Sequence, residues 1–191
     1  LGVDTSSEIL GVGLLPRYPE SSGGPAVGSI SDSPAVPTDS PEIATMELDA
    51  GLHHVEQVMP TVEHLLQRRG VSPAQLLGLV AAKGPGSFTG LRIGVSLLKG
   101  MSGVGGAPLV LVPTLEAHAL PYSRLPGLLC STLDARKGRF YVQFFRKGEY
   151  LTPALDLAPE EVAERMSSLL LAGEEATVAG PDAGSLVDLL R

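Results

Sequence analysis

Apolar and polar positions along the 191-residue chain follow two patterns, short charge-poor runs and longer stretches with helical spacing. The short runs predict strands, and they cover residues 1–3, 9–15, 43–48, 76–82, 109–112, 128–133, 140–146 and 177–179. The helical spacing predicts helices over residues 51–69, 91–103, 114–120, 159–171 and 185–190. Strands that alternate with helices in this way predict an α/β fold.

Residues 51–69 give the clearest helical pattern, with the apolar side chains gathered on one face. Asp49 is expected to cap the start of this helix, and Gly70 is expected to end it. The charge-free runs 76–82 and 109–112 predict buried strands, the first of them covered on both faces. Residues 16–42 hold six prolines and six serines without a period, which predicts an exposed loop.

The order of elements predicts two lobes that separate at Pro113. Residues 1–112 form the first lobe, which includes the exposed loop, and residues 113–191 form a smaller second lobe. We expect the second lobe to be incomplete at its C-terminal end. Both halves begin with paired strands and continue into a helix, so the second half is predicted to be a smaller copy of the first.

Composition narrows the classes of function. Lysine and arginine total 14 against 21 aspartate and glutamate, a net charge of −7, and aromatic residues are only 4%. An acidic, aromatic-poor chain is a poor candidate for binding nucleic acid by itself. Its single cysteine excludes a disulfide framework and any multi-cysteine metal site. We expect a cytoplasmic protein without a targeting segment, because the first residues reach an acid at Asp4, unlike a signal peptide. No membrane segment is expected, because the longest uncharged apolar run, 100–115, is too short and contains two prolines.

A glycine-rich turn, residues 84–90, joins a predicted strand to a predicted helix. It matches neither the P-loop nor the dinucleotide-binding pattern. One interpretation is an anion site that uses Gly84, Gly86, Ser87 and Thr89 at the start of the helix. The other is a tight turn in which Ser87 or Thr89 caps the helix.

Gly94 and Gly100 lie inside the helix that follows this turn. A glycine within a helix costs about 1 kcal/mol relative to alanine, so another backbone is expected to approach closely at these positions. That backbone belongs either to the chain's own sheet or to another subunit, and the pattern leaves both possibilities open.

Two carboxylates stand at corresponding strand-to-turn junctions, Asp4 in the first half and Asp134 in the second. They are candidates for holding a magnesium nucleotide between the lobes, and the alternative is ordinary turn chemistry. The histidines do not have the spacing of a metal site, so no bound metal is expected. Cys130 lies in an apolar strand and is expected to be a core residue.

Four segments together resemble the bacterial TsaB (YeaZ-type) family, and they are ordered along nearly the whole chain. They are residues 1–7 (LGVDTSS), 52–60 (LHHVEQVMP), 84–95 (GPGSFTGLRIGV) with Lys99-Gly100, and 134–141 (DARKGRFY). The segment 84–95 is the most specific of them. The resemblance implies an actin-like fold with two lobes, shared with sugar kinases and heat-shock ATPases, in which helices flank mixed sheets.

The resemblance also implies a role in making threonylcarbamoyladenosine (t6A) in tRNA, as a non-catalytic subunit rather than an enzyme. The implied partner is a TsaD-type transferase, which carries a His-x-x-x-His metal pair after the corresponding strand. Here that register reads Thr114 to His118, so one ligand is missing. The resemblance further implies contact with a TsaE-type ATPase through the complex, only indirect contact with tRNA, and a homodimer when the chain is alone.

The expected association face is formed by the first two helices. Its predicted residues are His53, Val55, Met59, Val62, Arg92, Gly94, Leu97, Leu98 and Met101. No cofactor is firmly expected, although ATP or ADP within the complex is compatible with the pattern. The alternatives are a small actin-like ATP-dependent kinase or hydrolase that uses Asp4, Asp134 and the glycine turn, or a regulatory nucleotide-binding module.

Overall fold

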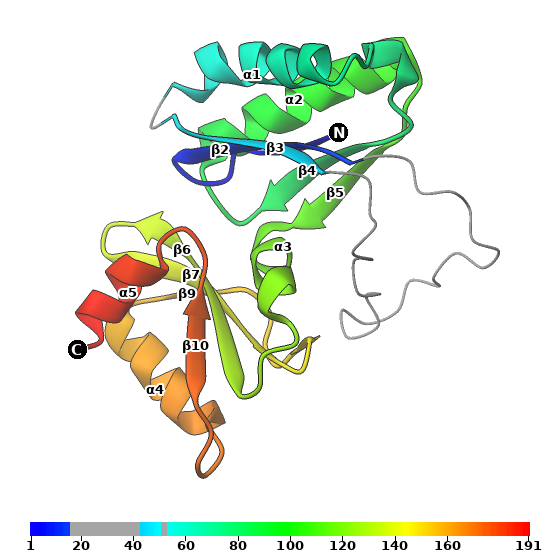
Figure 1. Ribbon diagram of the computed structural model, residues 1–191. Helices are drawn as coiled ribbons and strands as arrows, with labels where there is room; N and C mark the ends of the chain where they lie inside the picture. The colour runs from blue at the N-terminus through cyan, green and yellow to red at the C-terminus, as the bar shows by residue number, and fades with distance from the viewer. Residues whose placement is uncertain (16–42, 51–52) are drawn as a thin grey trace, which may run out of the picture. The chain divides into compact units, whose positions relative to one another are not determined.

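The computed structural model describes residues 1–15, 43–50 and 53–191. The predicted exposed loop, residues 16–42, lies outside the described residues. The described chain divides into two compact units, and the change from one to the other falls between Pro113 and Thr114 (Figure 1). No helix within the described ranges is both long and apolar enough to cross a membrane.

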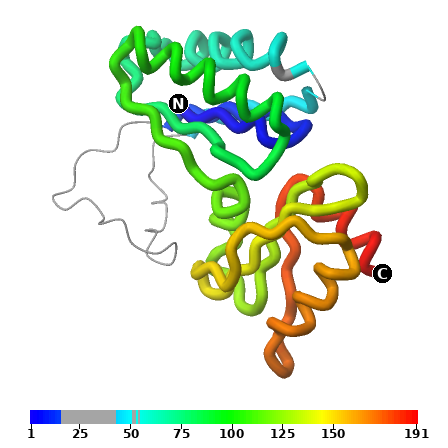
Figure 2. Tube along the Cα trace, turned by 180° about the vertical axis from the view of Figure 1, so that it is seen from behind, coloured from blue at the N-terminus to red at the C-terminus, as the bar shows by residue number. Residues whose placement is uncertain are grey.

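Unit 1 is a five-stranded sheet with two long helices on one face (Figures 1 and 2). Its strands are β1 (Gly2–Asp4), β2 (Ile9–Leu14), β3 (Ala44–Asp49), β4 (Leu79–Gly84) and β5 (Leu109–Pro113). Its helices are α1 (His54–Arg68), α2 (Phe88–Gly105) and the short 3-10 helix η2 (Pro73–Gln75). The strand order is β3-β2-β1-β4-β5. β1, β4 and β5 run parallel, whereas β2 pairs antiparallel with both of its neighbours, β1 and β3.

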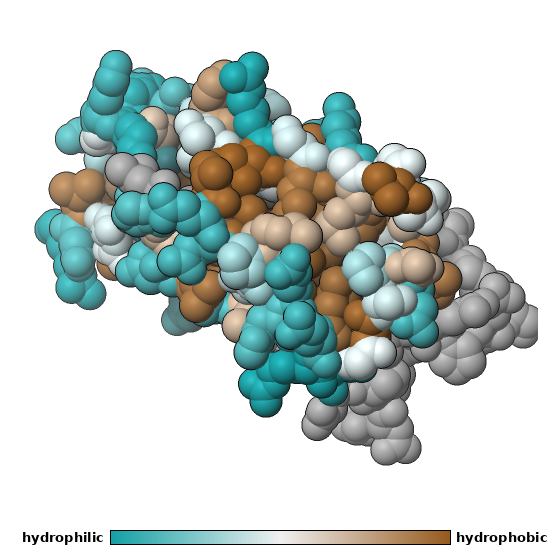
Figure 3. All heavy atoms as spheres, turned by 90° about the horizontal axis from the view of Figure 1, so that it is seen from above, coloured by the Kyte–Doolittle hydropathy of each residue, from teal (hydrophilic) through white to brown (hydrophobic). Residues whose placement is uncertain are grey.

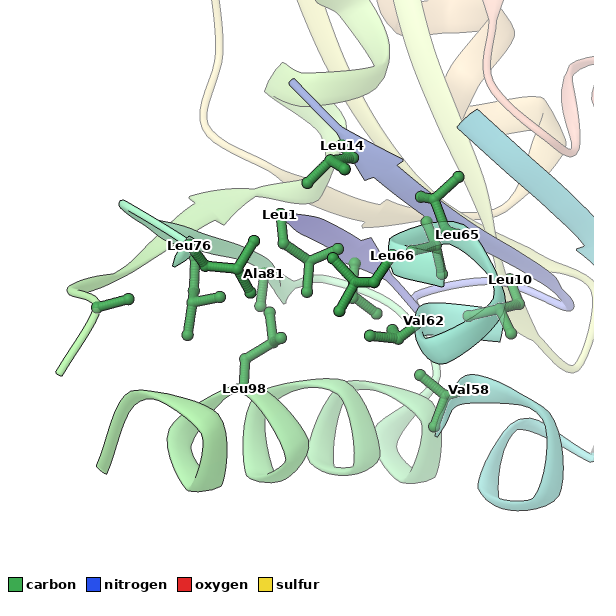
Figure 4. Packing of buried hydrophobic residues seen from close by; sticks show 14 of the residues in the cluster. Leu1, Leu10, Leu14, Val58, Val62, Leu65, Leu66, Leu76, Ala81 and Leu98 are labelled. Carbon is green, nitrogen blue, oxygen red and sulfur yellow. The ribbon is translucent and has the colours of Figure 1, made fainter. Parts of the chain in front are cut away.

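The core of unit 1 lies between this sheet and the two helices (Figure 4). Leu98 of α2 and Val62 of α1 are fully buried and point toward the strands. On the opposite face, Val80 of β4 is 38% exposed and Val110 of β5 is 56% exposed. Two predictions are therefore wrong for this unit, namely that residues 76–82 are buried on both faces and that residues 109–112 are buried. An apolar run shows only that the strand is apolar, whereas burial depends on which faces are covered.

The boundaries of α1 differ at one end from the prediction. Asp49 is the last residue of β3, where it pairs with Ile9, and the residue preceding the helix is His53. The predicted cap at Asp49 is wrong because the strand pairing continues through it. At the other end, Gly70 follows the final helical residues with a φ of +62°, so the predicted glycine stop is confirmed.

Unit 2 repeats the plan of unit 1 on a smaller scale. Its strands are β6 (Leu128–Arg136), β7 (Arg139–Arg146), β8 (Glu149–Tyr150), β9 (Leu155–Leu157) and β10 (Ala176–Ala179). Its helices are α3 (Thr114–Ala119), the 3-10 helix η3 (Leu120–Tyr122), α4 (Pro159–Leu169) and α5 (Ala183–Leu189). β6 pairs antiparallel with β7 and parallel with β10, just as β1 pairs antiparallel with β2 and parallel with β4. The predicted repeat is confirmed at the level of strand topology.

The core of unit 2 contains Cys130, Phe144, Val162 and Leu186, none of which is exposed. Burial raises the pKa of the Cys130 thiol to about 12, so the side chain stays protonated and unreactive at neutral pH. The expectation that this cysteine is a core residue is confirmed.

An ion pair ties β7 to the segment that follows α4. Arg146 donates from Nε to Glu174 Oε1 at 2.8 Å and from Nη2 to Glu174 Oε2 at 2.7 Å. Its Nη2 also donates to the carbonyl oxygen of Leu169 at 2.7 Å, and the Leu171 amide donates to Glu174 Oε2 at 3.0 Å. The hydrogen bond from Arg146, and then that from Leu171, lower the pKa of Glu174 to about 2.

This ion pair predicts a pH-dependent contribution to stability. The pKa of Glu174 falls from its ordinary 4.5 to about 2 on folding, so the stabilisation is complete above pH 4.5 and is lost as the pH falls toward 2. Glu174→Gln is expected to lower the Tm at pH 7 and to differ less from wild type near pH 3. Thermal melting of both proteins between pH 3 and pH 7 measures this difference in Tm. Glu175→Gln, at the exposed neighbouring residue, is the control. A difference that is constant with pH would contradict the assignment.

Candidate functional site: the glycine turn and the α1–α2 face

The turn after β1 and the glycine turn after β4 pack directly against each other. Because β1 and β4 are parallel neighbours, their C-terminal ends lie side by side. The amide of Ser87 donates to the carbonyl oxygen of Ser6 at 2.7 Å. The hydroxyl of Thr5 donates to the carbonyl oxygen of Gly90 at 2.7 Å, in a buried hydrogen bond. The glycine turn that the sequence singled out for anion binding is therefore bound to the turn after β1.

Three glycines of this region make room for residues 5 and 6 of the same chain, two for their backbone and one for a side chain. A Cβ at Gly86, whose φ is +152°, would lie 2.5 Å from the carbonyl oxygen of Ser6. A Cβ at Gly90 would overlap the carbonyl oxygen of Thr5, and one at Gly94 would lie 2.5 Å from Thr5 Oγ1. Of the two possibilities left open for Gly94, the structure matches the chain's own packing, because Thr5 fills that space. The assignment of Gly94 to the association face is therefore wrong.

Gly100 has a different environment from Gly94. Nothing lies within 4 Å of the position that a Cβ would take at Gly100, and the residue is exposed. Of the two helix glycines considered together in the sequence, one is a packing requirement of the fold and the other faces open space.

The start of α2 has the geometry of a capped turn. Ser87 is the N-cap, and its Oγ accepts a hydrogen bond from the Gly90 amide at 3.2 Å. This matches the turn interpretation with Ser87, rather than Thr89, as the capping residue. Gly84 has a φ of +108°, which suits the sharp change of direction after β4. The room that the glycines leave is occupied by residues 5 and 6, so this turn does not form an open phosphate cradle, and a nucleotide contact there stays a prediction.

Asp4 and Asp134 each accept a backbone amide two residues later, in the turn after β1 and at the end of β6 respectively. Asp4 Oδ1 accepts the Ser6 amide at 2.9 Å, and Asp134 Oδ1 accepts the Arg136 amide at 2.7 Å. Asp182, which the sequence did not single out, accepts the Asp134 amide at 2.8 Å. These bonds are the turn chemistry that was the alternative to magnesium binding. Contact between either carboxylate and a nucleotide stays a prediction.

No group of three or more histidine, cysteine, aspartate or glutamate side chains is placed to hold a metal within the ranges that the structure describes. Thr114, in the register of the missing ligand, opens α3 and is only 1% exposed. His118 follows one turn later on the same helix.

The outward side of α1 and α2 carries large apolar side chains. Val55 is 64% exposed, Met59 is 41% exposed and Phe88 is 69% exposed. The guanidinium of Arg92 lies over the Phe88 ring, 4.4 Å from its centre. Figure 3, which looks down on the molecule from above the view of Figure 1, shows a band of apolar surface bordered by hydrophilic side chains. Exposed apolar surface with a polar border is typical of an association face.

The predicted association residues divide between this face and the core. His53, Val55, Met59 and Arg92 are exposed, whereas Val62 and Leu98 are fully buried in unit 1. Leu97 and Met101 are half-buried and pack against the same core. The assignment of Val62 and Leu98 to an interface is therefore wrong. Helical spacing places residues on common faces, but α2 is apolar on both its inner and its outer face.

Phe88 is an exposed residue of this face that the sequence did not single out. It was treated only as part of the glycine turn. The signal that could have found it is its spacing, because Phe88 lies one turn before Arg92 on the same side of α2.

Comparison with known proteins shows the family and the fold. A family model described as TsaD, tRNA N6-adenosine threonylcarbamoyltransferase, matches residues 47–182. The protein from Escherichia coli named "tRNA threonylcarbamoyladenosine biosynthesis protein TsaB" is 34% identical over 69% of this chain and 61% of its own length. The Bacillus subtilis protein of the same name is 37% identical over 49% of this chain and 41% of its own length. The match with this chain thus spans about three fifths of the length of the Escherichia coli protein and about two fifths of that of the Bacillus subtilis protein.

Two solved structures share the fold. YeaZ from Pseudomonas aeruginosa superposes with a TM-score of 0.73 at 21% identity, covering 100% of this chain and 78% of that one. A second structure, described as similar to peptidase YeaZ from the same organism, gives 0.65 at 20% identity and covers 98% of this chain and 89% of its own. The fold is the α/β, actin-like fold that the sequence predicted, and the chain belongs to the TsaD family of proteins as a member of its TsaB/YeaZ type.

Proposed function

We propose that this chain is a non-catalytic subunit that binds and activates a TsaD-type threonylcarbamoyltransferase in the synthesis of t6A in tRNA. Support comes from relatives that are named as TsaB biosynthesis proteins and from others that are named as the transferase. The observation that carries the proposal is the exposed apolar face of α1 and α2, which includes Val55, Met59 and Phe88.

The proposal requires that this face become buried against a second protein. Removing apolar surface from water contributes about 25 cal/mol for each Å² buried, and aromatic and arginine side chains dominate the energy of many interfaces. Phe88, with Arg92 stacked on it, is such an anchor at the start of α2. The two helices lie side by side, so helices of a partner can pack on both at once (Figure 2).

The glycine turn argues against the enzyme alternative for the isolated chain. A kinase or hydrolase would need this turn to hold a phosphate. Thr5 and Ser6 instead take the space beside Gly86 and Gly90, and Ser6 already uses the Ser87 amide. Within the proposal, the subunit acts in the cytoplasm, any ATP or ADP belongs to the complex, and a TsaE-type ATPase and the tRNA reach this subunit through the transferase. The chain alone forms a homodimer.

Reconstitution tests the proposal. The transferase subunit of the same organism, its threonylcarbamoyl donor and unmodified tRNA are incubated with and without this chain, and t6A is measured in digested tRNA. We expect the yield of t6A to depend on this chain, and we expect the chain alone to hydrolyse no ATP above background. Hydrolysis of about one ATP per second or faster by the isolated chain, abolished by Asp4→Ala, would instead support the enzyme alternative.

A further inference from the structure

A shallow groove lies between β9 and α4 in unit 2, both labelled in Figure 1. Its volume is about 400 Å³, and its lining residues, called the α4 groove below, are Leu155, Leu157, Glu161, Glu164, Arg165 and Ser168. The two leucines belong to β9 and are half-buried, whereas the four residues of α4 are exposed. The groove therefore has an apolar side supplied by the strand and a polar side supplied by the helix.

The four α4 residues of the groove form one helical face, because they recur at spacings of three and four. Glu161 and Ser168 are its ends, about 10 Å apart along the helix axis. The midpoint of the face falls between Glu164 and Arg165. If two copies of α4 lie antiparallel across a two-fold axis through this midpoint, Glu164 of each copy faces Arg165 of the other. The face is therefore complementary to itself in charge.

The two central charges are available for such a contact. Neither Glu164 nor Arg165 forms an ion pair with another side chain in the described part of the molecule. They do not pair with each other either, because neighbouring residues of a helix point about 100° apart and do not face each other. Opposite charges that the fold leaves side by side on the surface can be paired by a second molecule.

The third charge of the groove, Glu161, is compensated within the chain. Its Oε2 lies 3.5 Å from Nη2 of Arg139 and accepts a hydrogen bond from the Ala158 amide at 2.7 Å. In the antiparallel arrangement Glu161 faces Ser168 of the other copy, a neutral residue with a hydroxyl group. No like charges of the groove would then meet across the axis.

This pattern favours a second copy of the chain over a different protein. In a two-fold symmetric dimer the same surface is used by both subunits, so each copy supplies the opposite charges in the required order. A uniformly acidic partner would face Glu164 with a like charge, and a uniformly basic partner would do the same to Arg165. Like charges brought together at an interface oppose association.

We propose that two copies of this chain form a symmetric dimer through the α4 groove, with the α4 helices antiparallel, Glu164 of each copy paired with Arg165 of the other, and the leucines of β9 covered. This inference rests on the homodimer of the proposed function, to which it adds the surface. It does not depend on binding of the transferase, because the groove lies in unit 2 and the α1–α2 face lies in unit 1.

Reversal of the two charges tests the inference. Analytical ultracentrifugation measures the dissociation constant of the dimer for wild type, Glu164→Arg, Arg165→Glu and the double variant Glu164→Arg with Arg165→Glu. Each single change puts like charges on both sides of the axis and is expected to weaken the dimer by at least about tenfold. The double variant is complementary to itself again and is expected to dimerise nearly as well as wild type.

The control is Glu175→Arg, which reverses a charge at an exposed residue outside the groove and is expected to dimerise as wild type. Circular dichroism confirms that each variant is folded. A mixture of the two single variants gives the sharpest result. Glu164→Arg presents two cations and Arg165→Glu presents two anions, so the mixture is expected to form a heterodimer at a concentration where neither variant dimerises alone.

The outcomes separate this inference from the proposed function. If wild type dimerises and both single variants dimerise equally well, the inference is overturned while the homodimer stands. Weakening that neither the double variant nor the mixture reverses would also overturn it, because the two residues would then not pair across an axis. If wild type stays monomeric up to about 1 mM, the homodimer fails together with this inference. The role in t6A synthesis is tested separately by the reconstitution.

Discussion

Replacing Gly90 by alanine is expected to destabilise unit 1 by about 3 kcal/mol, the upper end of the usual cost of overpacking. The added methyl group would overlap the carbonyl oxygen of Thr5. That oxygen belongs to backbone held by the hydrogen bond from the Thr5 hydroxyl to Gly90 and by that from Ser87 to Ser6, so it cannot move cheaply. Urea denaturation followed by circular dichroism measures the change in the free energy of unfolding.

The matched control is Gly100→Ala in the same helix. Nothing lies within 4 Å of the added methyl group there, so the substitution is expected to stabilise the protein by up to about 1 kcal/mol through helix propensity. The two variants make the same chemical change and differ in the expected sign. Equal effects, or a stable Gly90→Ala, would show that α2 does not pack on the turn after β1 as described.

Leu98→Ala is expected to cost about 2–5 kcal/mol, the range for a large aliphatic side chain removed from a packed core. Leu98 is 0% exposed and points from α2 toward the sheet (Figure 4). Val55→Ala, on the outward side of α1 where the side chain is 64% exposed, is the control and is expected to change stability by no more than about 0.5 kcal/mol. Thermal melting of the isolated chain measures the stability of both variants, and only Leu98→Ala is expected to melt at a clearly lower temperature than wild type.

One outcome for Leu98→Ala and Val55→Ala would show that Leu98 belongs to the association face rather than to the core. That would require Leu98→Ala to melt like wild type while weakening binding to the transferase. The structure predicts the reverse, with a destabilised chain for Leu98→Ala and an effect on association for substitutions on the exposed face.

The fold could be predicted from the sequence because its long elements carry strong periodic signals. The amphipathic spacing over 51–69 located α1, and Pro159 located the start of α4. β8 and β9 were missed because they are short and contain Glu149 and Asp156, so neither is a charge-poor apolar run. The cap of α1 was misplaced because the pairing of Asp49 with Ile9 is a tertiary contact.

The candidate site was only partly predictable. The glycine turn stood out, but what fills its space is Thr5 and Ser6, about eighty residues earlier in the chain. Only the parallel pairing of β1 with β4 brings them there. The exposed and buried sides of α2 could not be separated by hydrophobicity, because Phe88 and Leu98 are both large and apolar and only the packing tells them apart.

Hydrogen–deuterium exchange of this chain with and without the transferase subunit tests the central claim most directly. We expect binding to slow amide exchange in α1 and in the first three turns of α2, the elements that carry Val55, Met59, Phe88 and Arg92. Unit 2, residues 114–191, should exchange as in the free chain. Protection confined to unit 2, or no protection in either helix despite stable binding, would contradict the proposed association face.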